Sequence, residues 1–70
     1  MPLTLCKEDS VVKIIKLIGK EEIQRRIMEL GFVVDSELKV IINNNGELLV
    51  EIKNARIAIS KNIASKILVM

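Results

Sequence analysis

The sequence lacks most of the side chains from which catalytic and metal sites are built. It contains no His, Trp or Tyr, one Cys (Cys6) and one Phe (Phe32). Transition-metal sites draw on Cys, His and carboxylates, and a Cys or Ser nucleophile needs a neighbouring base. We therefore expect no catalytic residue, no metal ligand set and no cofactor, and the protein is not expected to be an enzyme. Cys6 and Phe32 are both expected to lie in the core.

The shortage of glycine and of aromatic residues excludes two further kinds of site. The three Gly residues stand at positions 19, 31 and 46, too far apart for the glycine-rich loop that cradles a phosphate. Grooves for proline-rich peptides are lined with aromatic side chains, and one Phe cannot line such a groove.

Charges of both signs are nearly balanced and are interspersed along the chain. Eleven Lys and Arg against nine Asp and Glu give a formal net charge of +2, which is too small for the clustered basic face that binds nucleic acid. No signal peptide is visible, and no apolar run is long enough for a transmembrane helix. We therefore expect a cytoplasmic protein with no nucleic-acid partner and no direct membrane insertion.

Aliphatic residues dominate what is present. Half of the 70 residues are apolar, a content that excludes a disordered chain. A chain of this length has room for one hydrophobic core, so residues 1–70 are expected to form a single domain.

The first half of the chain is expected to contain two extended segments and one helix. Residues 1–6 predict a short strand or extended entry, and Val11 to Ile18, rich in β-branched residues, predict a strand covered on both faces. Lys20 to Leu30 predict a helix, followed by Gly31 at a position that favours a left-handed residue. The inward face of this helix is expected to carry Ile23, Ile27 and Leu30.

Two aliphatic segments, Glu37–Ile42 and Glu47–Ile52, predict a hairpin. A two-residue Asn45-Gly46 turn would place their apolar residues on opposite faces, whereas a three-residue Asn44-Asn45-Gly46 loop aligns them. We therefore expect the three-residue loop, with Gly46 in the left-handed conformation of a bulge. The expected pairs are Ile42 with Leu48, Val40 with Val50 and Leu38 with Ile52.

The last third of the chain continues the same apolar face. A two-residue Lys53-Asn54 turn would pair Ile52 with Ala55, and Asn54 tolerates the positive φ that this turn requires. Ser60 is expected to cap a single helical turn, and a last strand closes the chain over residues 68–70. Inward positions in this segment are expected at Ile63 and Ile67.

These elements predict a mainly β fold. We expect a small barrel of about five short strands, with one α-helix after the second strand and a short helical turn before the last. Closure into a barrel would protect short strands from pairing at their edges.

Four short motifs occur in a fixed order along the chain. They read Arg25-Arg26-Ile27-Met28-Glu29-Leu30-Gly31, Leu38-Lys39-Val40, Arg56-Ile57-Ala58-Ile59 and Ala64-Ser65-Lys66-Ile67-Leu68-Val69. Each motif alone is common in small barrels, but their order and spacing together resemble the FeoA family of bacterial ferrous iron uptake. The resemblance spans nearly the whole chain. It implies an SH3-like β-barrel and an accessory role in the cytosol, in contact with the membrane iron transporter FeoB or its GTPase domain.

Three turns depart from the pattern of that family. Family members usually carry a Pro-Gly turn where this chain has Val34-Asp35, and Gly where it has Asn54. A Pro-Gly-Asp type of turn near the start is Glu8-Asp9 here. Asp and Asn are common at turn positions, so we expect these departures to change the rigidity of the turns more than the fold.

Two apolar residues are candidates for contact with a partner. Met28 falls outside the apolar stripe of the predicted helix, and Leu49 falls on the outward side of its strand. Each is either covered by a neighbouring segment of the chain or free to act as an adaptable apolar anchor.

Three arginines are further candidates. Arg25, Arg26 and Arg56 could face acidic groups of a partner. However, Glu21 and Glu22 lie four residues before Arg25 and Arg26, the order and spacing that favour ion pairs within a helix. We therefore interpret Arg25 and Arg26 first as part of a self-paired, solvated face.

Two other functions stay open. The same barrel forms the C-terminal regulatory domain of iron-dependent repressors, so a stand-alone regulatory module in metal-responsive transcription is one alternative. A small nucleic-acid-binding barrel is the other, although it would need stacking aromatics and a basic groove. The sequence leaves a homo-oligomer open as well.

Overall fold

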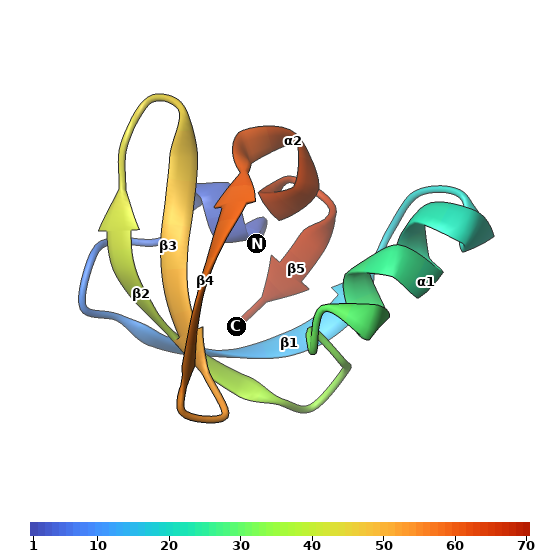
Figure 1. Ribbon diagram of the computed structural model, residues 1–70, viewed down its shortest axis with the longest axis horizontal. Coiled ribbons are helices and arrows are strands. Elements are labelled where there is room, and N and C mark those ends of the chain that lie inside the picture. The colour runs from blue at the N-terminus through green and yellow to red at the C-terminus, as the bar shows by residue number, and fades with distance from the viewer.

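The computed structural model describes every residue from 1 to 70 and contains five strands and two α-helices (Figure 1). In chain order the elements are the 3₁₀ helix η1 (Leu3–Leu5), β1 (Val11–Leu17), α1 (Glu21–Glu29), β2 (Glu37–Asn43), β3 (Glu47–Ile52), β4 (Ala55–Ser60), α2 (Lys61–Ala64) and β5 (Ile67–Val69).

The five strands form one antiparallel sheet in the order β4-β3-β2-β1-β5. Strands β4 and β5 are its two ends, and α2 connects them along the chain (Figure 1). The mainly β, SH3-like fold is confirmed. The sheet does not close into a complete barrel, because β4 and β5 do not pair with each other.

The N-terminal segment was expected to be a short strand or extended entry, but only Pro2 bridges to another strand, at Leu68, and residues 3–5 form a helical turn. The N–H of Cys6 donates to the carbonyl of Leu3, which closes the 3₁₀ turn η1. Leu3 and Cys6 are both buried, and a spacing of three places two side chains on one side of a 3₁₀ turn but on opposite faces of a strand. Helix α1 therefore follows the first strand of the fold, and the expectation of two strands before it is wrong.

Strand β1 is buried on one face only. Ile14 and Leu17 point into the core, whereas Val11 is 62% exposed and Ile15 is exposed too. The two buried residues are three apart, and an irregularity in the pairing with β5 between Ile14 and Lys16 accommodates this spacing. The expectation that β1 is covered on both faces is wrong, because no other element covers its outer face at these positions.

Helix α1 has the predicted range, with Lys20 and Leu30 as its capping residues. Gly31 follows with φ of 106°, which confirms the left-handed residue after the helix. Ile27 is fully buried, but Leu30 is 47% exposed, so its expected inward position is wrong. The reason is that α1 lies at one end of the long axis of the molecule and only part of its face reaches the core (Figure 1).

The loop between β2 and β3 differs from the expected one. Ile42 lies opposite Leu49, which is the register of a two-residue Asn45-Gly46 turn. Gly46 does not adopt a left-handed conformation. The predicted three-residue loop is therefore wrong.

A bulge in β2 reconciles this turn with burial of the apolar residues. The pairing shifts by one residue between Val40 and Ile42, and Val40 lies opposite Val50 as predicted. Val40 is buried, whereas Ile42 is 42% exposed. The chain thus keeps one apolar face by a bulge within the strand, and Ile42 does not take the inward position expected for it.

The turn between β3 and β4 has the predicted register. Lys53 and Asn54 have φ of 51° and 67°, and Ile52 lies opposite Ala55. The pairing continues without a shift to Glu47 and Ser60.

Three turns keep a left-handed residue without glycine. Asp9, Asp35 and Asn54 have φ of 70°, 77° and 67°, and they stand in the three turns that depart from the FeoA pattern. Asp and Asn tolerate this conformation better than other non-glycine residues. Asp9, Asp35 and Asn54 thus adopt at these turns the backbone conformation for which glycine is usually favoured.

The C-terminal elements agree with the sequence. The hydroxyl oxygen of Ser60 accepts a hydrogen bond of 3.1 Å from the N–H of Ile63, which confirms the predicted cap of α2. Ile67 is fully buried in β5 and Ile63 is half-buried against the core.

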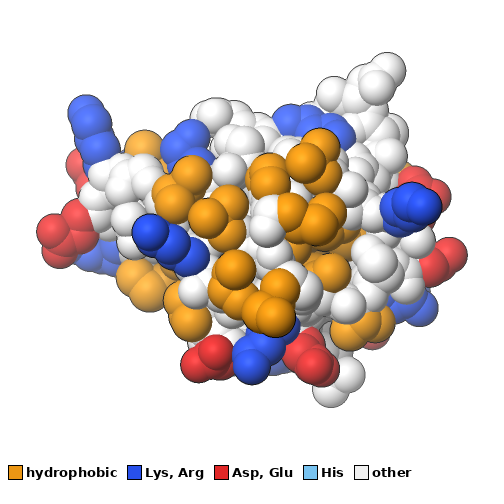
Figure 2. Space-filling model, turned by 180° about the vertical axis from the view of Figure 1, so that it is seen from behind, with side chains coloured by type: hydrophobic (Ala, Val, Ile, Leu, Met, Phe, Trp, Pro, Cys, Tyr) orange, Lys and Arg blue, Asp and Glu red, His pale blue; other side chains and the backbone are white.

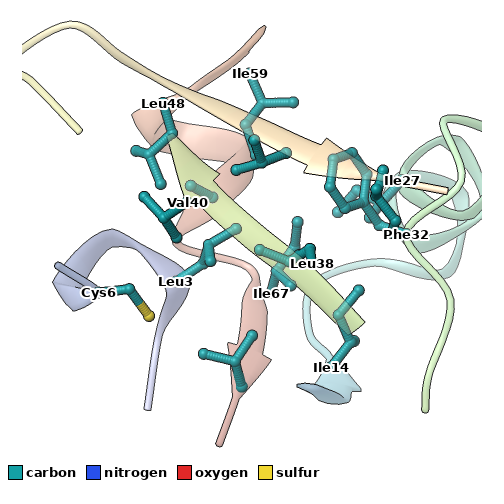
Figure 3. Packing of buried hydrophobic residues seen from close by; sticks show 14 of the residues in the cluster. Leu3, Cys6, Ile14, Ile27, Phe32, Leu38, Val40, Leu48, Ile59 and Ile67 are labelled. Atoms are coloured by element: carbon teal, nitrogen blue, oxygen red, sulfur yellow. The ribbon is translucent and has the colours of Figure 1, made fainter. Parts of the chain in front are cut away.

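One hydrophobic cluster fills the space inside the curved sheet (Figure 3). Phe32 is fully buried in it, and it lies with Ile27 at one end of the cluster, while Cys6 lies at the other (Figure 3). Both predictions of burial, for Phe32 and for Cys6, are confirmed. Burial raises the pKa of the Cys6 thiol above its ordinary value.

Candidate partner-contact surface

The protein has no pocket, and no group of three or more His, Cys, Asp or Glu side chains comes together in it. None of its helices is long and apolar enough to span a membrane. The features that distinguish its surface are exposed apolar side chains and their neighbouring charges.

Helix α1 carries three of the five predicted contact residues at exposed positions. Met28 is 44% exposed, and Arg25 and Arg26 are exposed on the same helix. The ion pairs that we expected with Glu21 and Glu22 do not form, because the two ion pairs of the molecule lie elsewhere. The interpretation of a self-paired face is therefore wrong, and both guanidinium groups are free.

Two exposed apolar residues adjoin this end of α1. Leu30 and Val34 are each about half exposed, and they follow the helix directly along the chain. The helical periodicity placed Leu30 in the core, so periodicity alone could not reveal this surface. Met28 and Leu30 are two residues apart and therefore lie on different sides of the C-terminal end of α1. We call the exposed residues around this end, Arg25, Arg26, Met28, Leu30 and Val34, the α1 surface.

Leu49 lies on the outer face of the sheet, as predicted. It is half-buried and stands between Ile42 of β2 and Ala58 of β4. Residues opposite each other in antiparallel strands share a face, so these three side chains form an apolar row across three strands. The sequence missed Ile42 as a member because the bulge in β2 reverses its side.

Arg56 lies on the same outer face of β4, two residue pairs away from the pair of Leu49 with Ala58. It is opposite Glu51 of β3, and its Nε lies 3.4 Å from Oε1 of Glu51. The charge of Arg56 is therefore partly compensated within the sheet. The structure brings Leu49 and Arg56 together on one sheet face, whereas Met28 lies on α1 at the other side of the molecule (Figure 1).

A third apolar area involves β1 and β5. Lys13 and Met70 exchange backbone hydrogen bonds of 2.9 Å, and Lys16 lies opposite Leu68. Met70 is 76% exposed and Leu68 is half-buried. Figure 2 shows apolar side chains gathered over the middle of the face turned away in Figure 1, with Lys or Arg side chains around them. No local pattern in the sequence predicts this area, because β1 and β5 are far apart along the chain.

A polar network fixes the N-terminal segment against the sheet. The side-chain amide of Asn43 donates to the carbonyls of Thr4 and Cys6, at 3.1 and 2.8 Å, and its oxygen accepts from the Nζ of Lys61. The backbone N–H of Asn43 donates to the carboxylate of Glu8 at 2.9 Å. The backbone N–H and both polar ends of the side chain of Asn43 are thereby used within the fold, so we assign Asn43 a structural role.

Comparison with known families gives a match over the whole chain. Residues 1–70 match the FeoA domain. A protein of Methanocaldococcus jannaschii assigned as Fe(2+) transport protein A is 35% identical over 68 residues, which are 97% of this chain and 83% of that protein.

Solved structures share the fold. A crystal structure of the iron uptake regulatory protein FeoA superposes with a TM-score of 0.90 at 17% identity, over 99% of this chain and 92% of the other. The FeoA-like protein of Clostridium acetobutylicum gives 0.90 at 22% identity, over 100% and 84%. A manganese-dependent transcriptional repressor in complex with manganese also gives 0.90 at 20% identity, but the match covers 99% of this chain and only 35% of the repressor.

The structural likenesses show a fold that occurs both alone and as part of a repressor. The family match and the archaeal relative go further, because they rest on sequence over nearly the full chain. This chain belongs to the FeoA family, the family of the ferrous iron transport protein A.

Proposed function

We propose that this chain is a cytoplasmic accessory protein of ferrous iron uptake that acts by binding the FeoB-type transporter, through the cytosolic GTPase domain of that transporter. The observation that carries the proposal is the match of residues 1–70 to the FeoA domain. The exposed apolar and basic side chains of α1 support a role in contact with another protein.

The α1 surface is the contact that we favour. Arg25 and Met28 are three residues apart and therefore lie on one side of the helix. A Met side chain adapts its shape to a partner, and an Arg side chain can bind a carboxylate through two parallel hydrogen bonds. Because Arg25 and Arg26 have no ion pair in the free protein, contact with a partner breaks no existing interaction.

The sheet face that carries Leu49 and Arg56 is the weaker candidate. Leu49 already loses part of its surface to its neighbours, and Arg56 would have to give up Glu51 to bind another carboxylate. We therefore expect these two residues to contribute less to binding than Met28 and the free arginines.

The test is a calorimetric titration of the chain against the purified cytosolic GTPase region of the transporter. Met28→Ala is expected to weaken binding about tenfold, the effect of losing one apolar anchor. Met70→Ala is the matched control, because Met70 directly follows β5 and is even more exposed than Met28. The affinity of Met70→Ala for the transporter region should equal that of the wild type. Arg25→Glu/Arg26→Glu should weaken binding and reduce its salt dependence.

Two results together would overturn the proposal. One is the absence of binding when both proteins are at tens of micromolar. The other is an unchanged rate of ferrous iron uptake in cells that lack this chain. Equal losses of affinity for Met28→Ala and Met70→Ala would be consistent with the transporter as the partner, but they would contradict the α1 surface as the contact.

A further inference from the structure

The two end strands of the sheet differ in whether their outer edges form hydrogen bonds. At the β5 end, Met1 and Val69 exchange hydrogen bonds of 2.8 and 2.7 Å, and Pro2 forms a bridge to Leu68. The N-terminal residues thus cover the outer edge of β5. At the other end, β4 pairs with β3 and with no further strand.

The free backbone groups of β4 can be identified from its turn. In a two-residue hairpin the residues that flank the turn, here Ile52 and Ala55, form a hydrogen-bonded pair, and such pairs alternate with pairs that are not bonded. Ile57 therefore points its N–H and C=O toward β3, while those of Arg56 and Ala58 point away from the sheet. No segment outside the ladder bonds to Arg56 or Ala58.

The edge of β4 lacks the features that usually block pairing with another strand. Edge strands are commonly protected by Pro, by a bulge or by charged side chains. Strand β4 contains no Pro, and its six pairs with β3 run without a shift, whereas β1 and β2 both carry irregularities. Its one charged residue, Arg56, is already paired with Glu51.

We propose that this edge binds the same edge of a second copy of the chain, with the two β4 strands antiparallel and centred on Ala58. The free N–H and C=O groups of Ala58 in each copy would then bond to each other. The proposal concerns self-association, and it stands whether or not the chain binds the transporter.

The side chains of β4 favour the register centred on Ala58 over the registers that are shifted by one or two residues. With Ala58 at the centre, Ile57 lies opposite Ile59 of the second copy, and Arg56 lies opposite Ser60 of that copy. A shift that centred the pair on Arg56 would place two like charges opposite each other, which is destabilising. If the pairing were centred on Ile57, the Arg56 side chains of the two copies would lie diagonally across from each other. They would still be closer together than in the register centred on Ala58.

The same register would also join the apolar rows on the outer faces of the two copies. Ile42, Leu49 and Ala58 form an apolar row across three strands. Because Ala58 lies at the centre of the proposed pairing, the rows of the two copies would join into one. A small side chain at this point allows the two rows to approach closely.

The test is sedimentation velocity of the wild type and two variants, from about 10 µM to about 1 mM, the range of weak and transient assemblies. The wild type should sediment as an increasing fraction of dimer. Ala58→Pro removes an N–H that β3 does not use, so it should keep the fold and weaken association at least about tenfold. Ala58→Ser keeps the N–H and should associate like the wild type.

Two further readouts keep the proposal testable if Ala58→Pro does not fold. In the wild type, the amides of Arg56 and Ala58 should exchange with solvent more slowly as concentration rises, while that of Val34 should not change. In a sample of mixed labelled and unlabelled chains, intermolecular NOEs should join Ile57 to Ile59.

Three outcomes would overturn the proposal. They are a wild type that stays monomeric over the whole range, an Ala58→Pro variant that folds and still dimerises like the wild type, and a monomeric wild type whose Ala58 amide is protected only when the transporter region is added. The last outcome would assign the edge to a strand of that partner.

Discussion

The two helices of this protein have opposite relations to the sheet. Helix α2 has four residues, begins with a side-chain cap at Ser60, and buries Ala64 completely. Helix α1 has nine residues, begins without a side-chain cap at Lys20, and buries only Ile27 completely. The shorter helix is thus the more firmly held of the two.

This difference separates a structural helix from one that is available for contact. Helix α2 joins the two end strands of the sheet, and the Nζ of Lys61 bonds to the side chain of Asn43. Helix α1 has one fully buried side chain, Ile27, and one partly buried one, Ile23, and it leaves its arginines unpaired. A helix held in this way can present its outer side to a partner without loss of core contacts.

The largest effect should come from removing the anchor of α1. Ile27→Ala is expected to lower the free energy of unfolding by about 3 kcal/mol, because it deletes buried methyl groups and leaves a cavity. Met28→Ala, one residue further along the same helix, should change it by less than about 0.5 kcal/mol, because Met28 faces solvent. Urea denaturation of both variants measures the difference, and similar losses would show that the outer side of α1 is packed.

A smaller effect should follow from removing the cap of α2. Ser60→Ala deletes the acceptor of the Ile63 N–H and should cost about 1 kcal/mol. Thermal unfolding measures the loss, with Ser10→Ala as the control for a half-buried Ser whose hydroxyl bonds to the backbone of a turn and does not cap an α-helix. A Ser60→Ala variant as stable as the wild type would contradict the structural role of this cap.

The smallest effect should be a gain in stability from a substitution at the start of α1. Lys20 already has the extended backbone of a capping residue, with φ of −63° and ψ of 150°, but no capping hydrogen bond. Lys20→Asp should supply the missing acceptor and a charge that favours the helix start, and stabilise the protein by about 0.5–1 kcal/mol. Lys16→Asp is the control, because it makes the same change of charge outside a helix start. Thermal unfolding measures both variants, and an equal gain in stability for Lys16→Asp would assign the effect to net charge and not to capping.

The parts of the fold that the sequence predicts are those decided by a few neighbouring residues. The Lys53-Asn54 turn, the Ser60 cap and the end of α1 at Gly31 each follow from the chemistry of one or two side chains. Burial of Phe32 follows from its size and its place after the helix. These features need no knowledge of distant contacts.

The errors arise where distant pairing decides the outcome. The bulge in β2 turns Ile42 outward, and no local signal marks its position. The segment Leu3–Leu5 forms a turn because Leu3 and Cys6 both reach the core. The free arginines of α1 were missed because spacing within a helix favours ion pairs but does not require them.

The candidate site could be predicted in part. The position of Met28 outside the apolar stripe predicts that it is exposed, and it is 44% exposed in the structure. Leu30 and Val34 extend the same surface, but helical periodicity alone placed Leu30 inside. Only the position of α1 at one end of the molecule reveals them.

The most direct test of the account is an NMR titration of the labelled chain with the cytosolic GTPase region of the transporter. We predict that the amide signals of residues 21–34 change most, and that those of β1 and β5 keep their positions. Changes confined to the β1 and β5 amides, or no change at a concentration of tens of micromolar, would contradict the claim that α1 is the partner-binding helix.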